Sequence, residues 1–578
     1  MKKKLLCWFF SIALAAALMG CGASKQAAEG NEVSDKDSIA ESEKGLSGTA
    51  ENAEDKDVSA KDEAGEKEAP EAVSKPKAII VTKSYYEYDE QEEALLFSGF
   101  NQGVLLAEES KADYPGLYDA LQKAWEDDLK ASNESAERLT KESRDQLHEM
   151  REYDPNREYV LSYEENCSAN IHRVDSRVFS FSFSMYSYMG GVHGMYGNSG
   201  RTYEAQTGKS LALADVITDL EAFGERLYDK VSVEYPDVVD YLEDPTTIRE
   251  QIIEELKNAP DTWELEPDGI VYFFNPYDIA AYASGEQIIK VSYKEAPDIF
   301  SEKYLPEEGT DYLSSVPNGK DFRLDMDGDG KPERFTLEEI IDNYEYDGEM
   351  YDTVGYKIVE DDGTETRIGE DGDVYGCEGY YASFAEGKTF LLLDCEAMND
   401  YHVVYVCSLE RDGIQELDSY GVYAKNIGYD DDTGLYGQYA FTDPSLLELT
   451  EHFDRLSTFF AGGEYYLSKE GVIEPKGEYA VIGEEAREFF VLTSKAALTV
   501  DIVDEGGKVV EKDIELPAGT DFQLYRTAYK EHNGAAIVDA YLTDGRIARI
   551  YYEIDEDYNR TVNGIDEWDA FGELFYAG

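Results

Sequence analysis

The feature that most constrains this 578-residue chain is a stretch that cannot fold by itself, residues 22–77. It consists mainly of Ala, Glu, Lys, Asp, Ser and Gly, with few large apolar side chains and no aromatic one. Such a segment buries too little apolar surface to offset the conformational entropy that it would lose on ordering. We therefore expect a disordered acidic tether at residues 22–77 and folded structure from about residue 78 onward.

The residues before the tether have the layout of an export signal. Met1–Lys4 carries three lysines, Leu5–Met19 is apolar and too short for a comfortable membrane span, and Gly20 precedes Cys21. The last four of these residues, Leu-Met-Gly-Cys, resemble the lipobox of bacterial prolipoproteins. That resemblance implies a diacylated Cys21 and a lipid anchor in the cell membrane, with the chain facing the extracellular side. The alternative is an ordinary secretory signal or a short membrane anchor with an incidental cysteine.

Charge and length bound the partners and the number of domains. The formal net charge of -72 argues against nucleic acid and anionic lipid headgroups as partners, because a uniform negative field repels phosphates. A cationic partner fits better. Length predicts two to four folded domains, and we place them at residues 78–310, 316–470 and 471–578.

The pattern of residues 78–310 predicts an α+β domain. Short strands are expected at 77–85 and 94–97, followed by a long amphipathic helix at 114–150 with a possible break at Ser132-Asn133. Residues 177–188 alternate Phe with Ser, which predicts a strand with its Phe rings on the core and its serines toward solvent. Further elements are expected as helices at 221–233 and 247–257 and as strands at 269–274 and 287–293.

Three ordered motifs in this region carry a resemblance to a known family. They are GGVHG at 190–194, YEAQTGKSLALADVI at 203–217 and YFFNPYDIAAYASGEQIIKVSY at 272–293. This region resembles the extracytoplasmic domain of RsiV-type anti-sigma factors, which also accompanies some peptidoglycan deacetylases. The resemblance implies a secreted or membrane-anchored α+β domain and, for the best-known members, binding of lysozyme. No sigma-binding segment, transmembrane helix or deacetylase catalytic domain is recognisable, so we expect neither sigma-factor signalling nor deacetylation from this chain.

Two of these motifs supply candidate ligand-binding residues. His193 lies in a glycine-rich stretch, where its ring is either an exposed binding group or a turn cap hydrogen-bonded to the backbone. The segment from Tyr277 to Tyr282 either lines a groove or packs internally. The candidate site therefore consists of Gly190, Gly191, His193, Gly194, Tyr277 and Tyr282.

The sharpest chemical motif is an aspartate-rich loop, Asp325-Met-Asp-Gly-Asp-Gly-Lys-Pro-Glu333. Oxygen ligands at alternate positions suit calcium, and the motif is similar to the calcium loops of FG-GAP repeats, in which a strand follows directly. It is not a full EF-hand, because Thr336 stands where a bidentate glutamate is required. We predict a structural calcium ion, the alternative being an acidic turn without metal. The predicted ligands are Asp325, Asp327, Asp329, Lys331 and Glu333.

The region beyond residue 316 is predicted to be mostly β, with hairpin turns such as Asp544-Gly545 between short strands. A helix at 445–461 is expected to divide it, with a domain boundary near 470–477. Outside the cytoplasm one disulfide is possible among Cys377, Cys395 and Cys407, while Cys167 is expected to be a buried free thiol.

Two classes of function fit these features. One is a non-enzymatic module that binds an extracellular protein of the lysozyme type or a cell-wall ligand such as peptidoglycan. The other is a cell-wall polysaccharide-modifying enzyme or its accessory subunit. The sequence has no HExxH motif, nucleophile elbow or CxxC pair. We therefore predict a binding protein without catalytic residues and with calcium as its one inorganic component.

Overall fold

The computed structural model describes residues 75–89, 94–154, 162–240, 246–258, 261–326, 332–346, 349–369, 374–397, 402–410, 413–430, 433–484, 486–555 and 559–576. Cys21 and residues 22–74 of the tether lie outside these ranges, as do Asp327, Asp329 and Lys331 of the aspartate loop. Among the helices that are described, none is long and apolar enough to cross a membrane.

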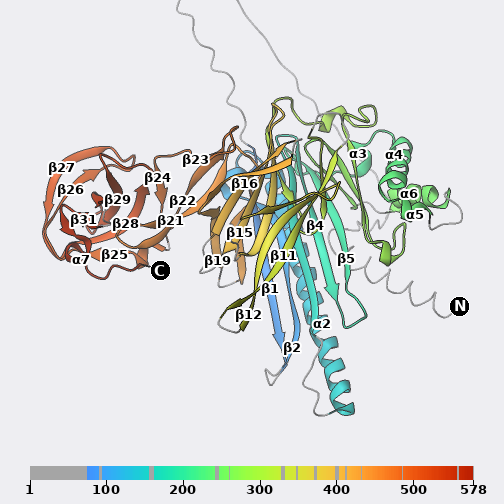
Figure 1. Cartoon of the computed structure of the whole chain (residues 1–578), viewed down its shortest axis with the longest axis horizontal. Helices are drawn as coiled ribbons and strands as arrows, with labels where there is room; N and C mark the ends of the chain where they lie inside the picture. Colours follow the sequence, from blue (N-terminus) through green and yellow to red (C-terminus); the bar gives the residue numbers. More distant parts are fainter. Residues whose placement is uncertain are drawn as a thin grey trace, which may run out of the picture. The chain divides into compact units, whose positions relative to one another are not determined.

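The first layer is a seven-stranded sheet with the order β19-β20-β1-β2-β3-β4-β5 (Figure 1). All neighbours pair antiparallel except β2 and β3, which are parallel because a long helix connects them. The strands are β1 (Ala78–Tyr88), β2 (Leu95–Leu106), β3 (Tyr163–Val174), β4 (Val178–Tyr188), β5 (Met195–Glu204), β19 (Asn426–Asp430) and β20 (Leu435–Tyr439).

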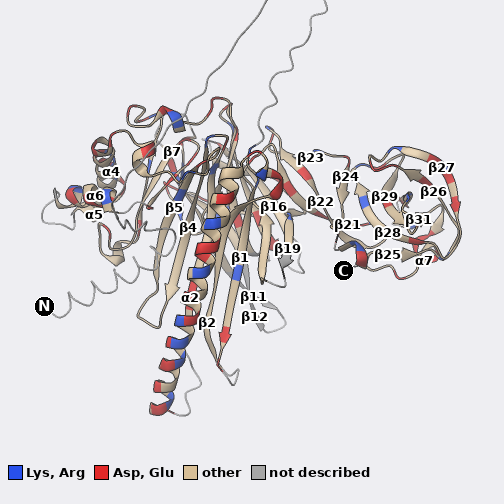
Figure 2. Ribbon diagram, turned by 180° about the vertical axis from the view of Figure 1, so that it is seen from behind, with Lys and Arg blue, Asp and Glu red and all other residues tan. Residues whose placement is uncertain are grey.

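The connecting helix, α2 (Pro115–Tyr153), packs along β2 and is continuous through the position where a break was considered possible. Asn133 remains helical and its side chain accepts a hydrogen bond from Tyr85 Oη at 3.0 Å. Trp125 lies so close to β2 that a Cβ atom at Gly103 would stand 2.1 Å from its ring, so only glycine fits there. Acidic and basic residues alternate along α2 in Figure 2, as expected for a solvated outer face.

The alternating strand β4 differs from its prediction on one face. Phe179, Phe181 and Phe183 are buried in the core beneath α2, as predicted. The serine face was predicted to be solvent-exposed, but Ser180 and Ser182 are buried as well. A three-stranded sheet covers them, and its Leu265 amide donates to Ser180 Oγ at 2.9 Å. The polar face is therefore the floor of a second, internal layer.

That covering layer combines a small sheet with helices. Its strands are β6 (Trp263–Leu265), β7 (Gly269–Phe274) and β8 (Gln287–Ser292). Apolar residues of α4 and α6, including Phe223, Leu227 and Ile252, pack with Tyr272 and Ile289 of the sheet. The helices of this layer and the short 3-10 turns are η1 (Glu108–Lys111), α3 (Leu213–Val216), α4 (Leu220–Glu234), α5 (Pro236–Asp240), α6 (Thr246–Asn258), η2 (Tyr282–Ser284) and η3 (Glu302–Tyr304).

The next part of the chain forms a five-stranded sheet, β17-β16-β15-β14-β9, beside a four-stranded one, β10-β11-β12-β13. The inner strands of the five-stranded sheet are buried on both faces, because their side chains enter two separate apolar cores, whereas the edge strand β17 is largely exposed. The strands are β9 (Tyr312–Val316), β10 (Asp321–Leu324), β11 (Glu333–Tyr346), β12 (Glu349–Glu360), β13 (Glu365–Ile368), β14 (Val374–Ser383), β15 (Thr389–Ala397), β16 (His402–Glu410) and β17 (Gly413–Tyr420).

A 13-stranded sheet completes the distal region and includes strands on both sides of residues 470–477, where a domain boundary was expected. Its strands are β18 (Val422–Ala424), β21 (Leu447–Asp454), β22 (Thr458–Leu467), β23 (Ile473–Pro475), β24 (Tyr479–Val481), β25 (Val491–Thr493), β26 (Leu498–Val503), β27 (Val509–Leu516), β28 (Asp521–Ala528), β29 (Ala535–Leu542), β30 (Ile547–Ile554), β31 (Arg560–Val562) and β32 (Ile565–Asp566), with η5 (Ala486–Phe489) and α7 (Glu567–Ala570) between or after them.

The helix predicted at 445–461 is wrong, because this segment forms the hairpin of β21 and β22. Leu447 and Leu449 are buried on one strand, and Phe459 and Ala461 on the other, which is a period of two. Leu456 turns the chain with a positive φ of 62°. The fold class is confirmed: α+β in the first region and nearly all β beyond it.

Candidate functional site

The predicted histidine lies in the loop between β4 and β5, where it is stacked on a predicted tyrosine. The rings of His193 and Tyr282 are 3.9 Å apart between centroids and inclined by 20°. Both side chains also reach the same backbone group: His193 Nδ1 and Tyr282 Oη lie 2.8 and 2.7 Å from the carbonyl oxygen of Gly194. The loop turns at Gly190, which has a φ of 74°, and Gly191 accepts a hydrogen bond from Tyr188 Oη at 3.1 Å.

Tyr277 lies against the same tyrosine from a strained turn. Its φ of 81° is rare for a bulky residue, and strain of this kind tends to be retained where a side chain must be presented in a fixed direction. Tyr277 is 53% exposed, and its ring is 5.8 Å from that of Tyr282. Tyr196 adds an edge-on contact to Tyr282 at 5.7 Å. We call His193, Tyr196, Tyr277 and Tyr282 the aromatic platform.

The turn that carries Tyr277 is clamped to β5 by paired amides. The Asn198 amide donates to Asn275 Oδ1 at 2.7 Å, and Asn275 Nδ2 donates back to the Asn198 carbonyl at 3.1 Å. Within the turn, the Asn275 amide donates to Asp278 Oδ2 at 2.7 Å. Burial, and then repulsion by Glu255, raise the pKa of Asp278 to about 7. The turn that carries Tyr277 therefore depends on Asp278, an acid whose protonated form is favoured by the folded state.

A groove of about 640 Å³ adjoins the platform, with Tyr196 common to both. This volume lies within the range of small-ligand sites and also accommodates protruding side chains of a protein. The charged lining consists of Glu286, Asp321 and Lys320, and two further tyrosines, Tyr186 and Tyr235, contribute their rings. Because aromatic faces and carboxylates both attract cations, this lining favours a basic or amphipathic ligand.

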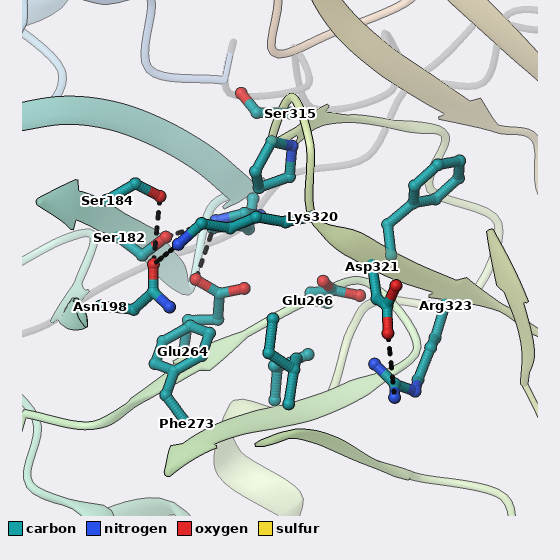
Figure 3. Close-up of a pocket in the computed structure, with 15 residues that line it drawn as sticks. Ser182, Ser184, Asn198, Glu264, Glu266, Phe273, Ser315, Lys320, Asp321 and Arg323 are labelled. Atoms are coloured by element: carbon teal, nitrogen blue, oxygen red, sulfur yellow. Dashed lines mark hydrogen bonds and ion pairs between the residues drawn. The ribbon is translucent and has the colours of Figure 1, made fainter. Parts of the chain in front are cut away.

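A buried polar cluster lies beneath the groove, around a cavity of about 30 Å³ (Figure 3). His172 Nε2 is 2.8 Å from both Glu264 Oε2 and Ser182 Oγ. Lys290 Nζ lies 2.5 Å from Glu266 Oε2 and 2.6 Å from Asp268 Oδ1. Burial lowers the pKa of His172, but attraction by Glu264 and Glu266 outweighs it and the net shift is upward.

Lys320 connects the cluster to the groove, since it lines both spaces. Its Nζ donates to Asn198 Oδ1 at 2.5 Å (Figure 3). The same Nζ lies 3.4 Å from Glu286 Oε1, and Asn198 Nδ2 donates to Glu286. Ser184 Oγ also donates to Asn198 Oδ1, at 3.1 Å. Burial lowers the pKa of Lys320 more than Glu286 raises it.

Among the described residues, one group has the spacing of metal ligands: His172, Glu264 and Glu266, whose ligand atoms lie within 4.8 Å of one another. Lys290 pairs with both Glu266 and Asp268, and the His172 ring pairs with Glu264, so each of these carboxylates already has a basic partner within the protein. The cavity holds about one water molecule and His172 is 1% exposed, so an outside substrate cannot reach this histidine in the conformation described.

The aspartate loop joins β10 and β11, which pair antiparallel with Leu324 opposite Glu333. The strand predicted to follow the loop is confirmed by β11. At the ends of the loop, Asp325 Oδ2 is 2.8 Å from Lys294 Nζ, and Glu333 Oε2 accepts the Met326 amide at 2.9 Å. The other three predicted ligands lie outside the described residues, so calcium binding stays a prediction.

The structure thus brings His193, Gly194, Tyr277 and Tyr282 together, with Gly190 and Gly191 in the adjoining loop. Sequence reasoning missed Asn198, Glu286 and Lys320. Lys320 comes from a loop 122 positions beyond Asn198, and no local pattern reports such a pairing.

Comparisons with known proteins give two family matches in this part of the chain. Residues 107–196 match the family described as deacetylase PdaC, and residues 225–294 match a family of proteins of unknown function, DUF3298. Both matches lie inside the region with the RsiV-like motifs. They make this region similar to extracytoplasmic accessory domains of unknown function. No curated protein matches the chain.

Solved structures include two DUF3298 family proteins that are similar in part. The one from Bacteroides fragilis is 18% identical with a TM-score of 0.30, and the match covers 40% of this chain and 96% of that protein. The one from Pseudomonas aeruginosa is 15% identical with a TM-score of 0.25, covering 41% of this chain and 99% of that protein.

Proposed function

We propose that this chain is a surface lipoprotein, anchored through an acylated Cys21, that binds a cationic extracellular protein of the lysozyme type. The observation that carries the proposal is the aromatic platform, exposed at Tyr277 and continuous through Tyr196 with a groove containing two carboxylates. Aromatic rings held rigidly by neighbours are typical anchors of protein interfaces.

Electrostatics support a basic partner over a neutral one. The net charge of -72 attracts cationic proteins over long range. In the groove, Glu286 is already paired with Lys320 and Asp321 with Arg334, so the tyrosine faces are the groups that remain to receive a basic side chain. A guanidinium or ammonium group could also lie over a tyrosine face of the platform. Lysozymes of the animal type are basic, and the RsiV-like motifs point in the same direction.

The test is binding of hen egg-white lysozyme to the full chain, with one variant that removes a ring while leaving the backbone unstrained. Tyr277→Gly suits this purpose, because glycine adopts a φ of 81° without steric cost. Removing a central aromatic anchor is expected to raise Kd by roughly 10-fold or more. The melting temperature should stay the same or rise, which separates loss of contact from loss of fold.

The matched control is Tyr153→Ala, which removes a tyrosine that is 97% exposed at the end of α2. This variant should bind lysozyme as the unchanged chain does. Binding should weaken as salt rises, because steering by net charge is screened. Absence of lysozyme binding at low salt would reject the proposed partner, and equal affinities for Tyr277→Gly and the unchanged chain would reject the proposed site.

A second candidate is an accessory subunit or enzyme acting on cell-wall polysaccharide, favoured by the match of residues 107–196 to the family described as a deacetylase. The arrangement of His172 and Glu264 resembles an acid-base pair, but it lies beneath the groove rather than in it. Acetate release from peptidoglycan by the purified chain tests this alternative. Under the binding proposal the chain alone releases none.

A further inference from the structure

Two of the buried cysteines face each other across neighbouring strands. Cys377 on β14 and Cys395 on β15 are direct partners in the antiparallel register, and their sulfur atoms are 2.9 Å apart. Residues opposite each other in such a pair have Cα atoms about 4.5 to 5.5 Å apart, which lies within the range that a disulfide spans. Both are thiols in the structure.

The same register excludes the third cysteine. Val403 of β16 is the partner of Cys395, whereas Cys407 is the partner of Leu391. Cys407 is therefore four residues along the strand from the position opposite Cys395, or about 13 Å at 3.3 Å per residue. A disulfide tolerates at most about 7 Å between Cα atoms, so Cys407 cannot replace Cys377 without movement of the backbone.

From this geometry we propose that Cys377 and Cys395 form a disulfide in the exported protein, which joins β14 to β15. The inference rests on the proposed extracellular location, because cytosolic thiols are kept reduced. In the reaction the two thiols give up two protons and two electrons, and a sulfur-sulfur bond forms between them. The electron acceptor is a small-molecule disulfide or a thiol-disulfide oxidoreductase, which is reduced to two thiols in exchange.

Burial determines when this bond forms. Cys395 is buried and Cys377 half-buried in the apolar core between the five-stranded and four-stranded sheets. Burial and the neighbouring sulfur raise the pKa of the Cys377 thiol well above its usual value, so little reactive thiolate exists once this core has closed. The disulfide therefore forms during folding and is then shielded from reductants. Its position in the sheet makes it a covalent staple of the layer between two cores.

The experiment compares the full chain isolated from an exporting bacterial host with the same chain refolded from urea in a mixture of reduced and oxidised glutathione. In both samples Cys377 and Cys395 should resist alkylation under denaturing, non-reducing conditions, and peptide mapping should find them linked. The variant Cys377→Ala should lose the link, and Cys407→Ala should keep it. Loss of a staple over eighteen positions should lower the melting temperature by roughly 5 °C.

The refolded sample tests the pairing of Cys377 with Cys395, and the sample isolated from cells tests the extracellular location. Alkylation of both cysteines after refolding, or a link to Cys407 or Cys167, overturns the proposed pairing. A link that forms on refolding and is absent from the chain isolated from cells overturns the disulfide in the exported protein, and with it the extracellular location, while lysozyme binding is tested independently. A melting temperature of Cys377→Ala equal to that of Cys407→Ala overturns the role as a staple.

Discussion

Two clusters of buried charged groups can be compared, and of these two the cluster in the 13-stranded sheet is the fully paired one. In the 13-stranded sheet, Asp539 accepts Arg526 Nε at 2.8 Å and Arg549 Nε at 2.8 Å. Tyr479 completes the cluster, with the Arg526 guanidinium 4.2 Å from its ring centroid and Arg549 Nη2 2.8 Å from its hydroxyl. No atom of these side chains appears among the buried polar atoms that lack a hydrogen-bond partner within the described ranges.

The cluster beneath the groove is different. Within the part of the chain that the structure describes, His172 Nδ1 and Arg323 Nη1 are buried without a hydrogen-bond partner, and both residues line the cavity of about 30 Å³. Buried polar atoms are normally paired, so each exception calls for a cause. In the distal cluster around Asp539 every buried polar atom is paired, as is typical of a structural element. The proximal cluster, together with the strained Tyr277 and the pKa of Asp278, has the incompleteness that is common next to binding sites.

The largest effect is expected where the distal cluster is broken. Asp539→Ala leaves two buried arginines without their shared carboxylate, which should lower the free energy of unfolding by about 3 to 5 kcal/mol. Urea unfolding of the full chain measures this change. The control is Asp544→Ala, because Asp544 pairs with Arg546 at an exposed turn, where solvent screens the attraction and its loss should leave the unfolding curve almost unchanged.

The same variant tests whether the two regions have separate roles. At temperatures where Asp539→Ala stays folded, its affinity for lysozyme should equal that of the unchanged chain. An affinity lowered as much as in Tyr277→Gly would break the contrast between a structural and a functional region.

A substitution of Asp278, in the turn that carries Tyr277, should raise the free energy of unfolding where Asp539→Ala lowers it. The folded state raises the pKa of Asp278 to about 7 from its usual value near 4, so it favours the protonated acid. The stability that this gives is fully present below about pH 4 and is lost as pH rises toward 7. Above pH 7 the buried carboxylate is a net cost to the fold.

Asp278→Asn removes that cost and keeps an oxygen to accept the Asn275 amide. We expect the free energy of unfolding to rise by roughly 1 to 3 kcal/mol at pH 8 and to change little at pH 4. Unfolding in urea at the two pH values makes the comparison. Equal effects at both would show that titration of Asp278 is not the cause, and destabilisation at pH 8 would contradict the contrast with Asp539.

The elements that form these two regions could be predicted only in part from the sequence. Strong periodicity identified α2, α4, α6 and the Phe stripe of β4, because a single face is enough to specify each element. His193, Tyr277 and Tyr282 were singled out from sequence, since glycine and proline mark the turns that carry them. The structure shows His193 bonded to the backbone of Gly194, as the turn-cap alternative predicted, and their stacking on one another was not predicted.

Features that depend on a second layer of structure could not be predicted from the sequence. An exposed serine and one covered by another sheet have the same sequence pattern, so the buried state of Ser180 and Ser182 was not visible. The run from 445 to 461 contains apolar residues at both helical and strand spacing. Pairing of β21 with β22, and of β22 with later strands, decides in favour of a sheet. Lys320 reaches Asn198 and Glu286 only through the tertiary fold.

The smallest effect is expected at the aspartate loop, where a calcium ion is predicted to neutralise the carboxylates. Asp325 pairs with Lys294 and Glu333 accepts the Met326 amide, so a calcium ion would have to compete with these two contacts. Extracellular calcium sites have Kd values of about 0.1 to 1 mM, so 5 mM calcium should stabilise the chain by roughly 1 to 2 kcal/mol. Magnesium should have less effect, because it demands a tighter octahedral shell. Asp327→Asn should abolish the shift in melting temperature, whereas Asp431→Asn should preserve it, because the consecutive aspartates at 430–432 lack the alternate spacing of calcium ligands. Calorimetric titration with no heat and no change in melting temperature would leave the loop an acidic turn, and the distal region would then be structural throughout.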